Sequence, residues 1–305
     1  MSASFATVLT ASRDAASSQH YPVGALYVVA TPIGNLADIT LRALHVLQLV
    51  DALACEDTRH TQTLLRAYGI DRASHLLIAL HQHNEAQAAL TVIERLRSGA
   101  RVAYVSDAGT PAISDPGARL VAAVRAQGLP VVPLPGPSSV TTALSVAGIG
   151  SAGGGDGGFV FAGFLSSKAA ERTQAVLALA GESRAIVLLE APHRIEALAA
   201  ALAMLGDRLV TIARELTKQF EEIATVRAVD FLGWLGAESN RARGEFVLVL
   251  HPVTVAAIAG EGQDLRVLTL LLEELPLKTA VKLAVEITGK SRNALYDAAL
   301  ALKKD

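Results

Sequence analysis

The feature that most constrains the fold is an alternation, in the first half of the chain, of short apolar runs with stretches of helical spacing. Each run is followed by a polar or small-residue loop, and the five runs lie at 25–30, 51–55, 76–80, 102–105 and 130–134. Short continuous apolar runs are typical of strands buried on both faces, and strand–helix alternation is typical of parallel sheets. We therefore expect five strand–helix units that form a parallel sheet covered by helices on both faces.

The fourth unit has the most informative loop. Residues 101–117 read Arg-Val-Ala-Tyr-Val-Ser-Asp-Ala-Gly-Thr-Pro-Ala-Ile-Ser-Asp-Pro-Gly, without a bulky side chain from Ser106 to Ala112. A small-residue loop at the carboxyl end of a buried strand allows a ligand to lie against bare backbone. The loop is longer than a tight turn needs, which favours a ligand floor. Asp115 is a candidate N-cap of the next helix, and Pro116 is its candidate first residue.

Three other loops carry residues that suit a ligand, although each has a plainer interpretation. Thr-Pro-Ile-Gly-Asn-Leu at 31–36 lacks the G-x-G-x-x-G dinucleotide fingerprint, so a connecting turn explains it equally well. Glu-Asp-Thr-Arg at 56–59 groups four polar residues where a strand ends, and an ordinary helix cap through Asp57 or Thr58 explains it locally. Pro-Gly-Pro-Ser-Ser at 135–139 exposes backbone N–H groups and two hydroxyls at a helix N-terminus, where anions bind.

The third strand is followed by two histidines, His81 and His83, with Glu85 close by. Helical zinc motifs place histidines four residues apart, and no further His or Cys cluster supplies ligands. We therefore expect no metal site, and we interpret this loop as a substrate-facing edge with Asn84 as the N-cap of the next helix.

The second half of the chain follows a segment whose glycine content is too high for a packed helix or strand. Residues 148–158 contain seven glycines in eleven positions, and we interpret them as a flexible linker. Two later strands end in clusters of acid and base, Glu-Ala-Pro-His-Arg at 190–194 and Arg-Glu-Leu-Thr-Lys at 214–218, which act either at a binding site or as structural salt bridges. The predicted strands of this second α/β unit are 159–165, 185–189, 209–213, 222–226 and 245–250, with helices at 168–180 and 229–235.

The end of the chain predicts three short helices, at 265–275, 277–287 and 293–302, in a helix-turn-helix outline. From Leu277 to Lys304 the net charge is +4, in a chain whose net charge is −2. A local basic surface suits phosphates, but a small packing or dimerisation module explains these helices nearly as well. Thr-Gly-Lys-Ser at 288–291 is not a P-loop, because the leading glycine of that motif is Ala284 here.

Composition narrows the class of protein. The chain has 305 residues, 51% of them hydrophobic and 18% charged, which indicates a globular protein of one large or two medium domains. A single cysteine, Cys55, excludes an intrachain disulfide. Residues 1–24 lack the basic and apolar regions of a signal peptide, and we interpret them as a flexible tail. No uncharged apolar run reaches transmembrane length, so we expect a cytoplasmic protein.

The loop motifs, taken together and in this order, resemble one family. The chain resembles the bacterial small-subunit ribosomal RNA cytidine 2′-O-methyltransferases, which belong to the tetrapyrrole methylase superfamily. The resemblance runs from about Leu26 to Pro252 and includes the tail. The departures, a longer N-terminal tail and the glycine-rich insertion after Ile149, lie outside the motifs.

The resemblance implies an α/β fold of two domains of the tetrapyrrole methylase type, with a cofactor cleft between them. On this chain the domains would be 25–147 and 159–252, with a tail at 1–24, a linker at 148–158 and a helical module at 253–305. The implied cofactor is S-adenosylmethionine, and the implied acceptor is the 2′-hydroxyl of a cytidine in the 16S RNA of the small ribosomal subunit. A homodimer is implied as well. The implied cofactor-binding residues are Pro32, Ala108, Gly109, Thr110, Ile113, Ser138, Ser139, Glu190 and Leu216.

Two sets of residues are hypotheses for the chemistry. The candidates for a general base are Glu56, Asp57, His83, Glu85, Glu190 and Glu215, and the candidates for contacts with RNA phosphates are Arg59, Arg194, Arg214 and Lys218. Two alternative functions stay open. A methyltransferase of the same fold that acts on a tetrapyrrole would need no basic tail. A ribosome-binding assembly factor without catalysis would need no cofactor, and the small-residue loops argue against it.

Overall fold

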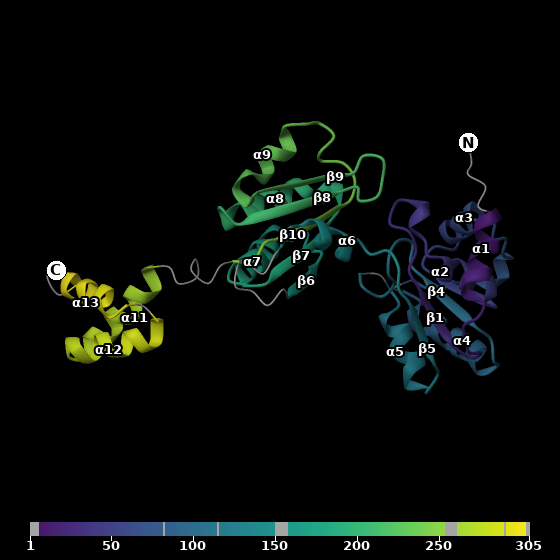
Figure 1. Cartoon of the computed structure of the whole chain (residues 1–305), viewed down its shortest axis with the longest axis horizontal. Coiled ribbons are helices and arrows are strands. Elements are labelled where there is room, and N and C mark those ends of the chain that lie inside the picture. The colour runs from purple at the N-terminus through teal and green to yellow at the C-terminus, as the bar shows by residue number, and fades with distance from the viewer. Residues whose placement is uncertain are drawn as a thin grey trace.

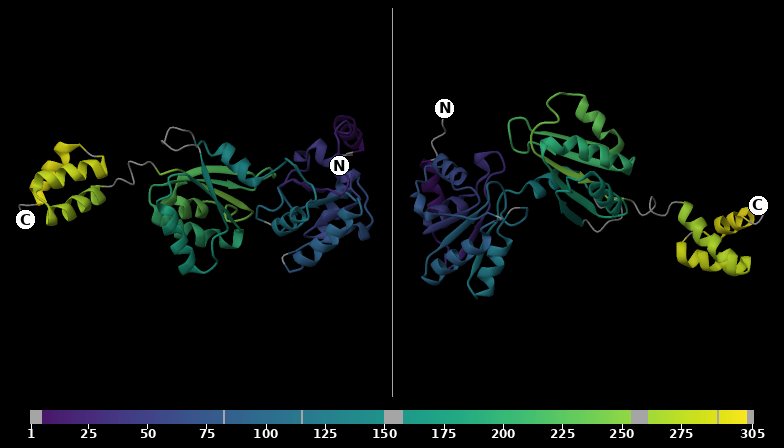
Figure 2. Two further views of the ribbon diagram at one scale, coloured as in Figure 1. Left: turned by 90° about the horizontal axis from the view of Figure 1, so that it is seen from below. Right: turned by 180° about the vertical axis from the view of Figure 1, so that it is seen from behind.

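The computed structural model describes residues 6–81, 83–114, 116–149, 158–253, 261–289 and 291–302. Two five-stranded sheets, each with helices packed against it, form the bulk of the molecule, and three helices follow at the C-terminal end (Figures 1 and 2).

The first sheet is parallel throughout, with the strand order β3-β2-β4-β1-β5. This confirms the arrangement that the alternating apolar runs predict. Parallel pairing places the carboxyl ends of all five strands, and the loops that follow them, at the same edge of the sheet. The strands are β1 Leu26–Val29, β2 Ala52–Cys55, β3 Leu77–Ala79, β4 Val102–Val105 and β5 Val131–Leu134.

Alternate residues of these strands face two different layers of helices. Tyr27 and Val29 belong to a core shared with α2 and α3, whereas Leu26 and Tyr104 belong to a core shared with α4 and α5. Burial on both faces explains why the strands read as continuous apolar runs. The helices are α2 Leu41–Leu49, α3 Thr58–Ala67, α4 Glu85–Arg97 and α5 Ala118–Ala126.

Helix α5 begins two residues after Pro116, which the sequence indicates as its first residue. Gly117, with φ at +122°, precedes the helix, and the expected N-cap Asp115 lies outside the described residues. The backbone N–H groups of Gly117 and Arg119 donate to Oε1 of Glu85, at 2.9 and 3.2 Å. A carboxylate from α4 therefore caps α5, which a search for local caps does not detect.

Residues 1–24 are not a flexible tail over the part that the structure describes. Helix α1 (Ala6–Ala16) packs against α2, where Gln48 Nε2 donates to Oγ of the buried Ser12 at 3.3 Å. Leu9 joins the core of the first sheet. The prediction was wrong because an alanine-rich stretch has high helix propensity, and the core that stabilises it is built by residues far along the chain.

The second sheet is mixed, with the order β6-β7-β10-β8-β9. Strand β6 runs parallel to β7, and the other neighbours pair antiparallel. The strands are β6 Phe159–Gly163, β7 Ala185–Glu190, β8 Leu209–Arg214, β9 Glu222–Arg227 and β10 Phe246–Leu250. One face packs on α7 Ala169–Ala180, α8 Ile195–Leu202 and α9 Phe231–Gly236, of which α8 was not predicted.

Helix α6 (Ser139–Val146) covers part of the opposite face of this second sheet, although it follows the last strand of the first. Val140 and Ala143 pack with Val187 and Val247. The predicted first domain, 25–147, includes α6, whereas the apolar contacts of this helix are to the second sheet. The N-terminus of α6 therefore lies where the two sheets approach each other. The predicted domain boundaries, at 148–158 and near 253, fall largely outside the described residues.

The C-terminal helices have a small core of their own, formed by Leu268, Val281, Ala284, Leu295 and Ala299. They are α11 Glu261–Glu274, α12 Leu277–Thr288 and α13 Arg292–Leu302, close to the predicted ranges. Gly289 ends α12 in the left-handed conformation, with φ at +71°.

In the part of the chain that the structure describes, no helix combines the length and the apolar character needed to cross a membrane.

Candidate active site

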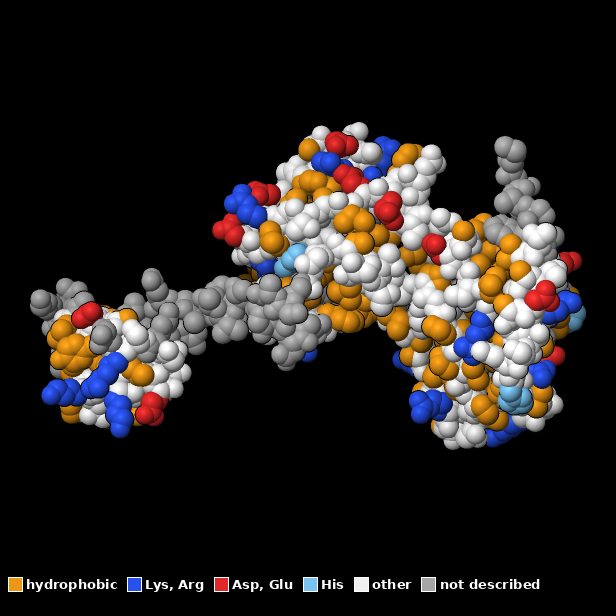
Figure 3. Space-filling view, in the orientation of Figure 1, with side chains coloured by type: hydrophobic (Ala, Val, Ile, Leu, Met, Phe, Trp, Pro, Cys, Tyr) orange, Lys and Arg blue, Asp and Glu red, His pale blue; other side chains and the backbone are white. Residues whose placement is uncertain are grey.

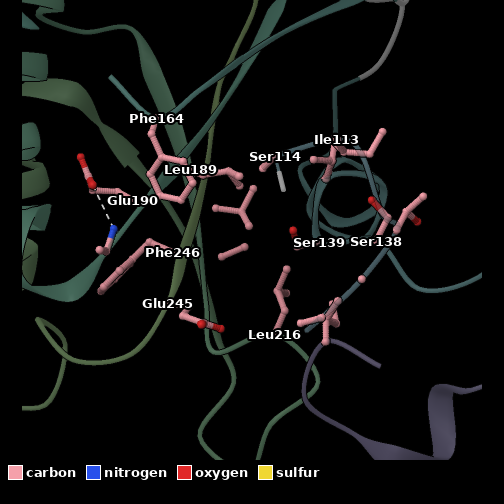
Figure 4. Close-up of a pocket in the computed structure, with 18 of the residues that line it drawn as sticks. Ile113, Ser114, Ser138, Ser139, Phe164, Leu189, Glu190, Leu216, Glu245 and Phe246 are labelled. Atoms are coloured by element: carbon pink, nitrogen blue, oxygen red, sulfur yellow. Dashed lines mark hydrogen bonds between the residues drawn. The ribbon is translucent and has the colours of Figure 1, made fainter. Parts of the chain in front are cut away.

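A pocket with a volume of about 310 Å³ lies between the two sheets, and Figure 4 shows the side chains around it. The first sheet contributes the loops after β1 and β4, and the second contributes the ends of β7, β8 and β10. The N-terminus of α6 forms a further part of the wall. The lining residues are Ile33, Ala108, Gly109, Thr110, Ile113, Ser114, Ser138, Ser139, Val140, Phe164, Leu189, Glu190, Ala191, Pro192, Ala213, Leu216, Glu245, Phe246 and Val247.

Backbone makes up much of the wall on the side of the first sheet. Thr31 and Gly109 exchange two backbone hydrogen bonds, of 2.9 and 3.0 Å, which join the loops after β1 and β4. Thr110 Oγ1 donates to the carbonyl of Pro137 at 2.9 Å. Gly109 and Ala112 both have positive φ, at +80° and +66°. Small residues are needed here because the loops pack closely on one another, and the same small residues leave backbone open to a ligand.

The two sheets meet beside the pocket, where the 31–36 loop contacts the 214–218 loop. The backbone N–H of Asn35 donates to Thr217 Oγ1 at 3.1 Å. A Cβ atom on Gly34 would lie 2.5 Å from Cγ of Lys218 and 2.8 Å from Thr217 Oγ1. Only glycine fits there without displacing the neighbouring loop. We refer below to this contact of Gly34 and Asn35 with Thr217 and Lys218 as the seam.

The structure brings the predicted cofactor-binding residues together. Eight of the nine line the pocket, and Pro32 is not among the described lining residues. Phe164, Glu245 and Phe246 are among the lining residues that were not predicted. Glu245 could have been predicted as a site residue, because it is a charged residue directly before an apolar run. Phe164 gave no such signal, because it was assigned to a strand that in fact ends at Gly163.

Glu190 lines the pocket with its backbone, whereas its carboxylate is engaged within the protein. Oε1 accepts a hydrogen bond from the backbone N–H of Ala191 at 2.9 Å and lies 3.0 Å from Nε of Arg194. Figure 4 shows this carboxyl group turned away from Ser138 and Ser139. Arg194 also donates through Nη2 to the carbonyl of Leu165. Both side chains therefore hold the chain around the pocket, and Arg194 is engaged within the protein rather than presented to an RNA phosphate.

The 214–218 motif contributes a lysine between two carboxylates. Nζ of Lys218 lies 2.8 Å from Oε1 of Glu215 and 2.9 Å from Oε2 of Glu245. Burial opposes the charge of Glu215, but hydrogen bonds from Lys218 and from the Glu245 N–H outweigh it and lower the pKa of Glu215. Burial likewise opposes the charge of Lys218, and the two carboxylates outweigh it and raise its pKa. The lowered pKa of Glu215 keeps its carboxylate charged near neutral pH, so Glu215 is a poor base.

Arg214 is buried rather than presented to solvent. Its Nη1 donates to the carbonyl of Arg243 at 3.2 Å, and its Nη2 lies 3.5 Å from Oε2 of Glu222. A buried guanidinium with these partners is not available to an RNA phosphate, which corrects the expectation for this residue.

The 56–59 motif begins α3 at the carboxyl end of β2. Asp57 is the N-cap, and its Oδ1 accepts hydrogen bonds from the N–H groups of Arg59 and His60, at 2.7 and 3.2 Å. These bonds lower the pKa of Asp57, so this carboxylate is also a poor base. Arg59 is exposed and lies outside the pocket lining.

The loop after β3 adds further groups at the same edge of the sheet, because β2 and β3 are neighbours. His83 is exposed, and its ring centroid is 6.0 Å from that of His81. Glu85 is buried and engaged in capping α5, which removes it from the candidates for a base. Within the described residues, no group of three or more His, Cys, Asp or Glu side chains could hold a metal ion.

Comparison with known proteins places this architecture in one family. Residues 25–230 match the tetrapyrrole (corrin/porphyrin) methylases, and residues 258–303 match the RsmI C-terminal HTH domain. The ribosomal RNA small subunit methyltransferase I of Escherichia coli O157:H7 is 47% identical over 279 residues, which cover 91% of this chain and 95% of the relative. The protein of the same name from Vibrio cholerae serotype O1 is 48% identical over 277 residues, covering 89% and 92%.

Solved structures with the same fold have lower sequence identity. A uroporphyrin-III-C-methyltransferase from Thermus thermophilus has a TM-score of 0.52 at 20% identity, covering 78% of this chain and 98% of its own. A cobalt precorrin-4 methyltransferase has a TM-score of 0.53 at 17% identity, covering 76% and 98%. These likenesses show the fold alone. Together with the family matches and the close relatives, they show that the chain belongs to the tetrapyrrole methylase family and, within it, to the ribosomal RNA small subunit methyltransferase I proteins.

Proposed function

We propose that this protein transfers the methyl group of S-adenosylmethionine to the 2′-hydroxyl of a cytidine in the 16S RNA of the small ribosomal subunit. Relatives at 43–48% identity that carry the name ribosomal RNA small subunit methyltransferase I support the acceptor. The observation that carries the proposal is the convergence of motif loops, distant in the sequence, around one pocket between the two sheets.

The residues of the pocket fit S-adenosylmethionine. Gly109 has positive φ, and a Cβ atom built on it would lie 3.2 Å from Cγ2 of Ile33. Glycine therefore leaves the backbone of the pocket floor uncovered. Apolar side chains such as Leu189 and Val247 suit an adenine ring, and the hydroxyls of Ser138 and Ser139 lie at the N-terminus of α6. We assign the cofactor to Ala108, Gly109, Thr110, Ile113, Ser138, Ser139, Leu216 and the backbone of Glu190. Pro32, the ninth residue that the resemblance implies, is outside the pocket lining.

The cofactor, when bound, supplies an electrophilic methyl group on a sulfonium. The protein must place the ribose oxygen in line with that group and accept the proton of the hydroxyl. Placement alone lowers a barrier by as much as about 7–11 kcal/mol, and a general base adds roughly 10²- to 10⁴-fold. Of the six candidate bases, Asp57, Glu85, Glu190 and Glu215 are held by caps or ion pairs. Glu56 and His83 stay candidates on position, since they lie in the loops after the neighbouring strands β2 and β3.

Arg59 is the RNA contact that we retain from the four basic candidates. It lies exposed at the loop edge of the first sheet, next to Glu56. Lys218, Arg194 and Arg214 are engaged in ion pairs within the protein. Lys278, Lys282 and Arg292 supply a second basic surface, on the C-terminal helices (Figure 3). Lys290, Lys303 and Lys304 of the same predicted surface lie outside the described residues.

The assembly and location of the protein complete the proposal. We assign a cytoplasmic homodimer, on the family resemblance and because small ribosomal subunits are the acceptor. Light scattering on the purified protein measures the mass in solution, and a value of one chain would overturn the dimer.

The function is tested by offering tritiated S-adenosylmethionine with three acceptors: assembled small subunits, naked 16S RNA and a tetrapyrrole precursor. We expect label in a cytidine ribose, recovered as a 2′-O-methyl nucleoside after digestion. Label in the tetrapyrrole would show the fold to be right and the acceptor wrong. A protein that does not bind the cofactor would overturn the enzyme assignment as a whole.

A further inference from the structure

Phe164 is a large aromatic side chain at the pocket, and half of it is open to solvent. It lines the pocket and is 53% exposed. Figure 4 shows its ring beside Leu189, on the opposite side of the pocket from Ser138 and Ser139. An aromatic side chain that contributes little to a core while lining a functional cavity is a candidate contact for a ligand.

The backbone before Phe164 turns away from regular strand geometry. The pairing of β6 with β7 shifts register between Phe161 and Gly163, and Gly163 has φ at +64°. The next residue after Phe164, Leu165, is buried in the core of the second sheet. The chain therefore leaves β6 at Gly163, presents Phe164 at the pocket and is anchored again at Leu165.

Arg194 fastens this segment to the end of β7. Its Nη2 donates to the carbonyl of Leu165, and its Nε lies 3.0 Å from Oε1 of Glu190, whose side chain is fully buried. The bridge runs from the pocket end of β7 to the residue that follows Phe164. Arg194, a candidate RNA contact on the sequence alone, thus fixes the segment that presents the aromatic ring.

The size of the pocket limits what lies against the ring. A volume of about 310 Å³ is at the lower end of the range for small-molecule sites, roughly 300–1,000 Å³. One cofactor fills such a space, so the second reactant must enter from the mouth. A nucleotide in an unpaired loop of the RNA can be turned out of the stack, which lets its ribose hydroxyl approach a recessed methyl group. A nucleotide turned out in this way needs a surface for the face of its base.

We infer that Phe164 is the platform on which the base of the target nucleotide stacks, and that Arg194 is a positioning residue for this platform. The inference rests on the proposed function. Stacking on an aromatic side chain contributes roughly 5- to 150-fold per base and tolerates any base, because every base has a π face. Phe164 therefore places the nucleotide, and recognition of cytosine as such falls to other groups.

The test compares Phe164→Ala with Phe164→Tyr, and with Phe159→Ala as a matched control. Phe159 begins β6, the strand that ends just before Phe164; it is 44% exposed and is outside the pocket lining. Methyl transfer to small subunits gives kcat/KM, and calorimetry gives the Kd for S-adenosylmethionine. We expect Phe164→Ala to lower kcat/KM by roughly 10- to 100-fold with the cofactor Kd within about twofold of wild type. Phe164→Tyr and Phe159→Ala should stay near wild type.

Three outcomes would overturn the inference. An equal loss of cofactor affinity in Phe164→Ala would make the ring part of the cofactor wall. Unchanged transfer by Phe164→Ala would leave the ring without a role. Transfer by the wild type to a tetrapyrrole and not to RNA would remove the proposed function, and with it the platform; the wild-type reaction separates this result from the other two.

The positioning role of Arg194 is tested by a double-mutant cycle. If Arg194 acts through Phe164, adding Arg194→Ala to Phe164→Ala lowers kcat/KM little further, whereas a general structural role makes the two losses multiply. Multiplying losses, with the folded fraction matched by thermal unfolding, would overturn the positioning role.

Discussion

The two walls of the pocket are built by different means. On the side of the first sheet, parallel strands end in loops of small residues, and the wall is largely backbone held by hydrogen bonds such as those between Thr31 and Gly109. On the side of the second sheet, ion pairs hold the wall, among them Glu190 with Arg194 and Lys218 with Glu245.

The difference between the walls changes how charged motif residues are interpreted. Arginines and lysines at the ends of strands suggest phosphate binding when the sequence is considered alone. In the second sheet, three of the four basic candidates form ion pairs with carboxylates of the same half of the molecule. These basic side chains form ion pairs that hold separate segments of the second sheet together. They are structural and do not present their charge to RNA. Four predictions test this comparison, from the largest expected effect to the smallest.

The backbone wall should be the more sensitive to an added side chain. Gly109→Val places a β-branched residue at φ +80°, with Ile33 Cγ2 3.2 Å from the new Cβ. We expect the Kd for S-adenosylmethionine to rise by about 100-fold or more, which corresponds to roughly 3 kcal/mol. Gly128→Val is the matched control, because Gly128 also has positive φ, at +70°, but lies in open space. It should lose thermal stability and keep cofactor affinity; a loss of affinity there would show that backbone strain alone explains the Gly109 result.

The seam should matter for catalysis more than for folding. Gly34→Ala forces the loops apart, since its Cβ would lie 2.5 Å from Cγ of Lys218. We expect kcat/KM to fall roughly 10- to 100-fold, because small displacements of reacting groups are costly. Gly181→Ala, at a glycine with nothing within 4 Å of its Cβ position, should leave transfer unchanged. Normal transfer by Gly34→Ala would mean that the seam does not set the geometry of the pocket.

The buried and the exposed arginine should behave oppositely. Arg214→Met leaves Glu222 without one partner of its ion pairs, and we expect the free energy of unfolding to fall by about 3 kcal/mol in urea titrations. Arg59→Ala should change that free energy by less than about 0.5 kcal/mol. It should raise the KM for small subunits about 10-fold through a lost phosphate contact, at unchanged cofactor affinity. A loss of cofactor binding in Arg59→Ala would refute its assignment to RNA.

The pairing of Lys218 with Glu215 should appear in the pH dependence of stability. The pKa of Glu215 is lowered, so its contribution is present above the unfolded pKa and is lost as the pH falls through the folded value. The pKa of Lys218 is raised, so its contribution is complete below the unfolded pKa and is lost as the pH rises through the folded value. We expect Lys218→Met to cost about 1 kcal/mol between about pH 6 and 9 and less below pH 4 or above pH 11, measured by urea unfolding. A difference that does not vary with pH would exclude the ion pair as its source.

Local patterns in the sequence were enough for the elements of the first sheet, and the loop motifs carried the family resemblance that implied part of the pocket. Apolar runs such as Val102–Val105 record burial on both faces, and parallel pairing then brings the following loops to one edge. The family resemblance of the motif loops implied eight of the lining residues, and small residues beside a strand end were a local signal for the floor at Ala108, Gly109 and Thr110. The exact start of α5 and the helix α1 were missed, since Glu85 and the first-sheet core stabilise them from a distance.

Tertiary structure decided which partner each polar or aromatic residue has. The carbonyl of Leu165 and the carboxylate of Glu190 lie 29 and 4 residues from Arg194, and only the packed sheet shows that one guanidinium joins them. Phe164 follows a shift of register in the pairing of β6 with β7, and this shift cannot be detected from the sequence. Helix α6 packs on the second sheet although it follows the first. The sequence determined the local periodicity and the loop chemistry, whereas burial and charge pairing depend on contacts between distant segments, which form only in the folded chain.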